Sequence, residues 1–127
     1  MTDVSDIRTR LRRALIGALK VRDASTVSAL RSALSAIDNA EAVEPGPAQP
    51  AGSGSEHFAG AAAALGTAEA ERRRLTEADV AAIVRAEAAE REAAAREYER
   101  SGHAEQAARL RHGTQDLLAA AADEEPA

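Results

Sequence analysis

An ion pair on an apolar stripe is the first place where this sequence could do chemistry. From Val80 onwards, apolar side chains recur at helical spacing, and Glu87 and Arg91 lie on the same stripe, one turn apart. A buried charge without a partner costs several kcal/mol, so the two side chains are expected to pair. Arg31, beside Val27 on an earlier apolar stripe, is expected to face Glu87 and to complete a polar cluster.

Two interpretations of the cluster of Arg31, Glu87 and Arg91 stay open. It fixes the register of Ala-rich helices, which have little side-chain shape of their own to specify packing. Alternatively, one of the two arginines binds a phosphate or a carboxylate of a partner. Either way, Glu87 is expected to matter more than Glu92, which the helical period places on the far side, near Arg85.

Other catalytic chemistry finds little support in the sequence. Glu87 and Glu90 are the only paired carboxylates near an apolar face, and no pocket can be assigned to them. His57, His103 and His112 fall in a linker, at a helix start and in a helix middle, without the spacing of metal ligands. No phosphate-binding glycine loop and no nucleophile elbow is present. The sequence therefore predicts no catalytic residue, no metal site and no cofactor.

The composition of the 127 residues limits the class of protein. There is no Cys, which excludes disulfides and thiolate metal sites, and there is one Phe, one Tyr and no Trp. A chain so rich in Ala can build only a thin core of small side chains. No apolar run approaches the about 20 residues of a membrane span, and the N-terminus lacks an apolar signal core. A cytoplasmic protein without membrane contact is expected, and its oligomeric state stays open.

Charge is unevenly distributed along the chain, although the net charge is −5. Residues 1–40 hold seven basic and four acidic side chains, whereas residues 71–127 hold nine basic and thirteen acidic ones. Only the first part is therefore biased toward phosphates, unless its charge simply balances the acidic second half. The run of arginines at 72–74 is expected to be solvated. The candidates for contact with tRNA or another partner are Arg10, Arg13, Lys20, Arg31 and Arg91.

Helical periodicity and capping signals predict an all-α fold. Two antiparallel helical hairpins should form a small four-helix bundle in a single domain, joined by a flexible linker rich in Pro, Gly and Ala at about 44–66. Asp23 and Thr76 suit helix N-caps, and Gly102 suits a helix end. Gly113 is expected to weaken its helix by about 1 kcal/mol relative to Ala. The helices should span about 5–22, 24–43, 77–100 and 103–122, with a disordered tail at 123–127.

Two ordered segments of the chain resemble the signatures of the GatB/YqeY-like family. The first contains Leu19-Lys20-Val21-Arg22-Asp23, Leu30-Arg31 and Ala36-Ile37-Asp38-Asn39-Ala40-Glu41. The second contains Leu75-Thr76-Glu77-Ala78-Asp79-Val80, Glu87, Glu90-Arg91-Glu92, Tyr98 and Gly102. The resemblance covers roughly residues 8–43 and 74–120.

The resemblance implies a helical accessory domain. In that family such a domain usually precedes a small helical tail, which this chain is expected to lack and which is shared with the B subunit of the tRNA-dependent amidotransferase. It implies a non-catalytic module that binds tRNA or a translation-related protein. A protein–protein adaptor without a nucleic acid role is an alternative. Another is a carbon–nitrogen ligase with glutamine as amido-N-donor, which rests on the family label.

Overall fold

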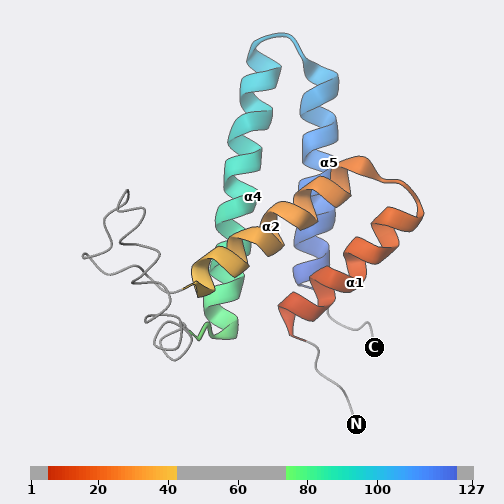
Figure 1. Cartoon of the computed structure of the whole chain (residues 1–127). Helices are drawn as coiled ribbons and strands as arrows, with labels where there is room; N and C mark the ends of the chain where they lie inside the picture. The colour runs from red at the N-terminus through yellow and green to blue at the C-terminus, as the bar shows by residue number, and fades with distance from the viewer. Residues whose placement is uncertain (1–5, 43–73, 123–127) are drawn as a thin grey trace, which may run out of the picture. The chain divides into compact units, whose positions relative to one another are not determined.

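The structure of the chain, a computed structural model, describes residues 6–42 and 74–122 and is helical throughout them apart from caps and turns (Figure 1). The predicted all-α class is confirmed, and no strand occurs in these residues. The expected linker at 44–66 and tail at 123–127 lie outside the described ranges. The helices are α1 (Ile7–Lys20), α2 (Ala24–Glu41), α4 (Glu77–Arg100) and α5 (Ala104–Ala121).

Side-chain caps start three of these helices, and Asp23 Oδ1, which accepts from the Thr26 N–H at 3.2 Å, caps α2 as the sequence predicted. Asp6 accepts a hydrogen bond of 2.8 Å from the Thr9 N–H at the start of α1, and this bond lowers the pKa of Asp6. At the start of α4, Asp79 N–H donates to Thr76 Oγ1 at 2.9 Å, and Thr76 N–H donates to Asp79 Oδ2 at 3.0 Å. This reciprocal capping box places the N-terminus of α4 where the sequence predicted it.

Both hairpins turn through a residue with a left-handed backbone. In the joint between α4 and α5 this residue is Gly102, with φ of 87°, which is the usual choice. In the joint between α1 and α2 it is Arg22, with φ of 60°, and the next N–H, that of Asp23, closes α1 by donating to Ala18 O at 2.9 Å. A non-glycine residue in this conformation costs about 1–3 kcal/mol. Arg22 is therefore a strained position of the fold.

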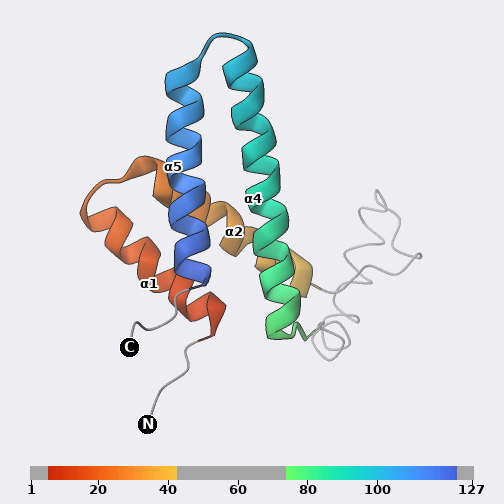
Figure 2. The ribbon, with the colours of Figure 1, turned by 180° about the vertical axis from the view of Figure 1, so that it is seen from behind.

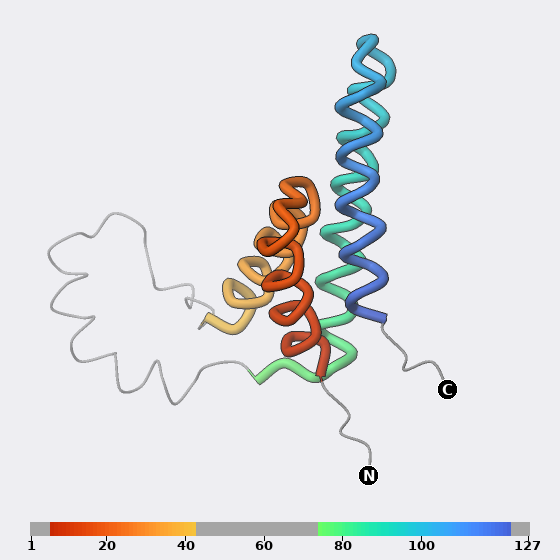
Figure 3. Tube along the Cα trace, turned by 90° about the vertical axis from the view of Figure 1, so that its right-hand side faces the viewer, coloured from red at the N-terminus to blue at the C-terminus, as the bar shows by residue number. Residues whose placement is uncertain are grey.

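The two hairpins form two layers that pack on each other (Figure 3). Helices α4 and α5 run antiparallel side by side, and the α1–α2 hairpin lies across one end of them (Figures 1 and 2). Fully buried alanines such as Ala29 and Ala95 keep the helices close. The largest fully buried side chains are Leu11, Leu30, Ile37, Val84 and Leu117.

The apolar stripes predicted from the sequence are buried only in part. Tyr98 is 40% exposed, because it lies near the joint of α4 and α5, where that hairpin extends past the other layer (Figure 1). Leu118 is also exposed, and Leu19 is 45% exposed near the end of α1. Periodicity identifies the side of a helix that is apolar but not how far along the helix a neighbouring layer extends.

Gly113 lies at a close contact between helices. It is buried, and a Cβ built on it would lie 2.8 Å from the carbonyl carbon of Ser25, and closer still to that carbonyl oxygen. The nitrogen of Thr26 would be 3.3 Å away. The absence of a side chain therefore allows the backbones of α5 and the first turn of α2 to touch, which the helix propensity of glycine alone does not predict.

Candidate functional site

The polar pair on the stripe of α4 is enclosed, and Arg31 is not part of it. Arg91 Nη1 lies 3.8 Å from Glu87 Oε2, and these side chains are 13% and 16% exposed. Arg91 Nε is buried and has no hydrogen-bond partner among the described residues. Arg31 is exposed on α2, and within residues 6–42 and 74–122 its side chain has no ion pair or hydrogen bond. The expected three-residue cluster is thus reduced to the Glu87–Arg91 pair.

Glu92 contacts α5, which corrects its expected position on the far side of α4 near Arg85. Arg111 of α5 donates to both oxygens of Glu92, with Nη2 2.9 Å from Oε2 and Nε 3.1 Å from Oε1. Its Nη1 also donates to Glu99 Oε2 at 2.6 Å. These hydrogen bonds lower the pKa values of Glu92 and Glu99 and raise that of Arg111. Periodicity could not show that α5 lies along this side of α4.

Replacing Arg111 by alanine should lower the urea midpoint of unfolding at neutral pH. Folding lowers the pKa of both carboxyls, so the pairs stabilise the fold above the unfolded pKa of about 4.3. This contribution is lost as the pH falls through the lowered values. The midpoint difference from the unaltered chain should therefore shrink in acid. Arg109→Ala is the control, since Arg109 lies 3.9 Å from Glu105 in an exposed pair. Equal midpoints for the two variants at neutral pH would contradict the prediction.

The basic side chains predicted to face phosphates on α1 are not equivalent. Arg10 donates to the carbonyl oxygens of Ala121 at 2.6 Å and Ala120 at 3.4 Å, at the C-terminus of α5. A guanidinium there satisfies carbonyls that have no helical partner and opposes the negative end of the helix dipole. Arg13 and Lys20 are exposed. Arg10 thus holds α1 against α5, and two of the three side chains expected to bind phosphate remain accessible.

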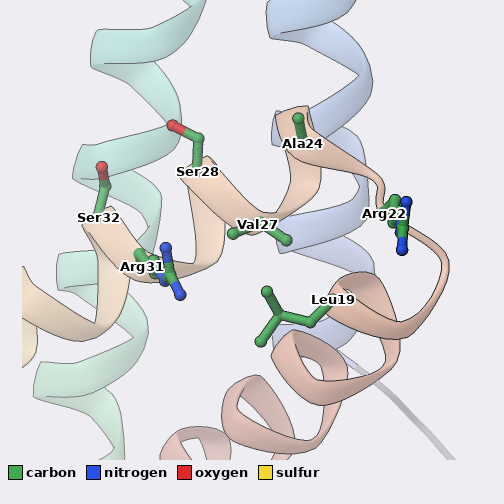
Figure 4. Close-up of a pocket in the computed structure, with 7 residues that line it drawn as sticks. All are labelled: Leu19, Arg22, Ala24, Val27, Ser28, Arg31 and Ser32. Atoms are coloured by element: carbon green, nitrogen blue, oxygen red, sulfur yellow. The ribbon is translucent and has the colours of Figure 1, made fainter.

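A groove lies between the end of α1 and the first half of α2 (Figure 4). Its volume is about 590 Å³. Leu19 and Val27 face each other in the groove, with Arg22 to one side of this apolar pair and Arg31 to the other (Figure 4). The remaining lining residues are Ala24, Ser28 and Ser32.

The groove combines exposed apolar surface with positive charge. Close to Leu19 on the same stretch of chain, Ile16 and Val21 are exposed as well. A guanidinium binds a carboxylate through two parallel hydrogen bonds, and two such groups flank the groove. This arrangement suits a ligand that carries an aliphatic side chain between carboxylates. The sequence pattern assigned Arg31 to the polar cluster with Glu87 and Arg91, and so did not predict the groove.

Asp23, Thr26, His112 and Asp116 converge where α5 meets the first hairpin. His112 Nε2 lies 2.8 Å from Asp23 Oδ2 and 3.5 Å from Asp116 Oδ2. Thr26 Oγ1 lies 2.8 Å from Oδ2 of both aspartates. The hydrogen bond between Asp23 and His112 lowers the pKa of the carboxyl and raises the pKa of the imidazole. We call these four residues the Asp23–His112 cluster.

Sequence reasoning missed the Asp23–His112 cluster. His112 and Asp116 lie one turn apart on α5, which is a detectable signal, but Asp23 is 89 residues away from His112. One ligand atom from each of Asp23, His112 and Asp116 lies within 4.8 Å of the others, a spacing that could hold a metal ion. Of the two carboxylates considered in the sequence, Glu87 contacts Arg91 and Glu90 is exposed.

Comparisons with models of known protein families, with curated proteins and with solved structures find no match. The similarity to the GatB/YqeY-like family therefore stays a prediction from the sequence. None of the helices in the described part of the chain combines the length and the apolar character needed to span a membrane.

Proposed function

We propose that the chain is a non-catalytic helical accessory module that binds an acidic, aliphatic segment of another protein in the groove between α1 and α2. The observation that carries this proposal is the apolar pair Leu19 and Val27 between the guanidinium groups of Arg22 and Arg31. The resemblance to the GatB/YqeY-like family suggests that the partner is translation-related.

The strained backbone of Arg22 supports a binding role for the groove. Glycine would remove the strain at this φ of 60°, as Gly102 does in the other joint. Retaining arginine costs stability and places a positive charge beside the groove. Strained backbone positions are often found where function requires a particular side chain.

A protein partner fits the groove better than tRNA does. The described residues that line the groove include no aromatic side chain to stack on a base, and its centre is aliphatic. Arg10, one of the three side chains predicted to bind phosphate, already bonds the end of α5. Acidic side chains flanking a Leu or Ile would complement both the charge and the apolar surface of the groove.

Selection of random peptides displayed on phage, with the chain as bait, tests this proposal. The enriched peptides should share Leu or Ile flanked by Asp or Glu. Arg22→Glu combined with Arg31→Glu should weaken their binding by at least about tenfold. The matched control replaces Arg12 and Arg85, two exposed arginines outside the groove lining, by glutamate. This control variant should bind the peptides about as well as the unaltered chain does. Peptides without acidic residues, or equal losses in both double variants, would contradict the proposal.

Arg22→Gly should separate stability from binding. Relief of the left-handed strain should raise the free energy of unfolding by about 1 kcal/mol and Tm by about 4 °C. The same change removes one guanidinium from the groove and should weaken the selected peptides. Urea unfolding and fluorescence polarisation measure the two effects. If the variant is more stable but binds the selected peptides with unchanged affinity, Arg22 does not take part in peptide binding.

The tRNA alternative predicts a different outcome. Bulk tRNA should bind in a filter assay with an affinity that falls steeply with salt, and replacing Arg13 and Lys20 by alanine should reduce that slope by about one unit for each phosphate that is no longer neutralised. We expect neither effect for a groove that takes an acidic segment. Salt-dependent tRNA binding that requires Arg13 and Lys20 would replace the proposal.

A further inference from the structure

We infer that Asp23, His112 and Asp116 bind a divalent transition-metal ion of the Zn²⁺ class. The site does not depend on the proposed function of the groove. Its ligands come from the joint of the first hairpin and from α5, so a bound ion would link these two parts of the fold.

The three ligand atoms already lie close to the spacing that Zn²⁺ requires. Zinc binds imidazole nitrogen and carboxylate oxygen at about 2.0–2.2 Å, so tetrahedral ligand atoms lie about 3.3–3.6 Å apart. His112 Nε2 is 3.5 Å from Asp116 Oδ2 and 2.8 Å from Asp23 Oδ2. All three ligand atoms lie within 4.8 Å of one another. His112 and Asp116, whose side chains are exposed, could rotate to place their ligand atoms around an ion held by Asp23.

The oxygens of Asp23 have separate roles, so capping and metal binding are compatible. Oδ1 accepts from the Thr26 N–H at 3.2 Å and caps α2, whereas Oδ2 points at His112. The Thr26 side chain, in a residue only 5% exposed, lies behind the ligands with its hydroxyl 2.8 Å from Oδ2 of both aspartates. A ligand carboxylate is typically held by such a hydrogen bond.

Charge and donor chemistry favour a transition metal. The hydroxyl of Thr26 has one proton but lies 2.8 Å from two carboxylate oxygens, so one of these short contacts has no proton of its own. Two carboxylates and a neutral imidazole balance a divalent ion. An imidazole ligand suits Zn²⁺ and not Mg²⁺, which prefers oxygen ligands alone. The side chains of His112 and Asp116 are 54% and 45% exposed, which leaves the ion accessible from solvent.

The test uses the untagged chain, freed of metals with a chelator, and Zn²⁺ as the probe. Saturating Zn²⁺ should raise Tm by about 5 °C or more, because an ion that binds only the folded chain stabilises it. Mg²⁺ at the same concentration should not. His112→Gln should weaken Zn²⁺ binding, measured by calorimetry, by more than about 100-fold, since removing a residue behind a ligand already costs about 10–100-fold.

Two further variants keep the result interpretable. Asp23→Asn retains an N-cap of equal quality but removes a charged ligand, so it should fold and bind Zn²⁺ more weakly. His103→Gln alters another exposed histidine, at the start of α5, and should bind Zn²⁺ as the unaltered chain does. The inference is overturned if Zn²⁺ does not raise Tm, or if His112→Gln and His103→Gln bind Zn²⁺ equally.

Discussion

Replacing Gly113 by alanine is expected to lower the free energy of unfolding by about 1–3 kcal/mol, although alanine is the better helix former by about 1 kcal/mol. The added Cβ would lie 2.8 Å from the carbonyl carbon of Ser25 and even nearer its oxygen. Both atoms belong to backbone, so relief requires α5 to move away from the start of α2. That movement would also disturb the 2.8 Å contact between Thr26 Oγ1 and Asp116 Oδ2.

Gly17→Ala is the matched control for this prediction. Gly17 lies on the exposed side of α1, and a Cβ there would meet nothing within 4 Å. This change should stabilise the chain by about 0.5–1 kcal/mol through helix propensity alone. Urea unfolding of both variants gives the comparison. If alanine stabilises the chain at both positions, the backbones at Gly113 and Ser25 do not touch as described, and the prediction is contradicted.

Glu87→Ala should produce the second large decrease in stability. It would leave Arg91 without the carboxylate that faces it. The Arg91 side chain is 13% exposed, and in the part of the chain that the structure describes its Nε already has no hydrogen-bond partner. Breaking a fully buried pair costs about 3–5 kcal/mol, and the remaining exposure of the pair reduces the expected cost to about 2–4 kcal/mol. In a fold with so thin a core, this is a large share of the total stability.

Two variants define the origin of that decrease. Glu90→Ala removes an exposed carboxylate from the same helix and should change the urea midpoint little. Glu87→Gln keeps the size and an acceptor oxygen, so its midpoint should fall between those of Glu87→Ala and the unaltered chain. A midpoint for Glu87→Ala that equals that of Glu90→Ala would mean that the pair contributes nothing to the fold.

The helices were predictable because their signals are local. Thr76 and Asp79 are three residues apart, and their reciprocal cap needs no information from elsewhere in the chain. Gly102 ends α4 for an equally local reason, its left-handed backbone. Such signals predicted the ends of the described helices to within about two residues.

The sites were less predictable because they depend on how helices cross. Periodicity gave the direction of Glu92 around α4 but not the position of α5, so its contact with Arg111 was missed. Helix propensity could not show that Gly113 lies against the backbone of Ser25, because that contact is with another hairpin. Asp23 and His112 are 89 residues apart and carry no shared spacing.

In the proposed complex, Arg22 and Arg31 bind acidic residues of a partner segment. A charge swap between the chain and the peptide tests this binding most directly. A selected acidic peptide and its counterpart with Lys in place of each acidic residue are titrated against two proteins by fluorescence polarisation. These proteins are the unaltered chain and the variant that combines Arg22→Glu with Arg31→Glu. We predict that the acidic peptide binds only the unaltered chain and that the Lys peptide binds only the double variant. If the double variant still binds the acidic peptide with unchanged affinity, or if no peptide is selected, the claim is contradicted.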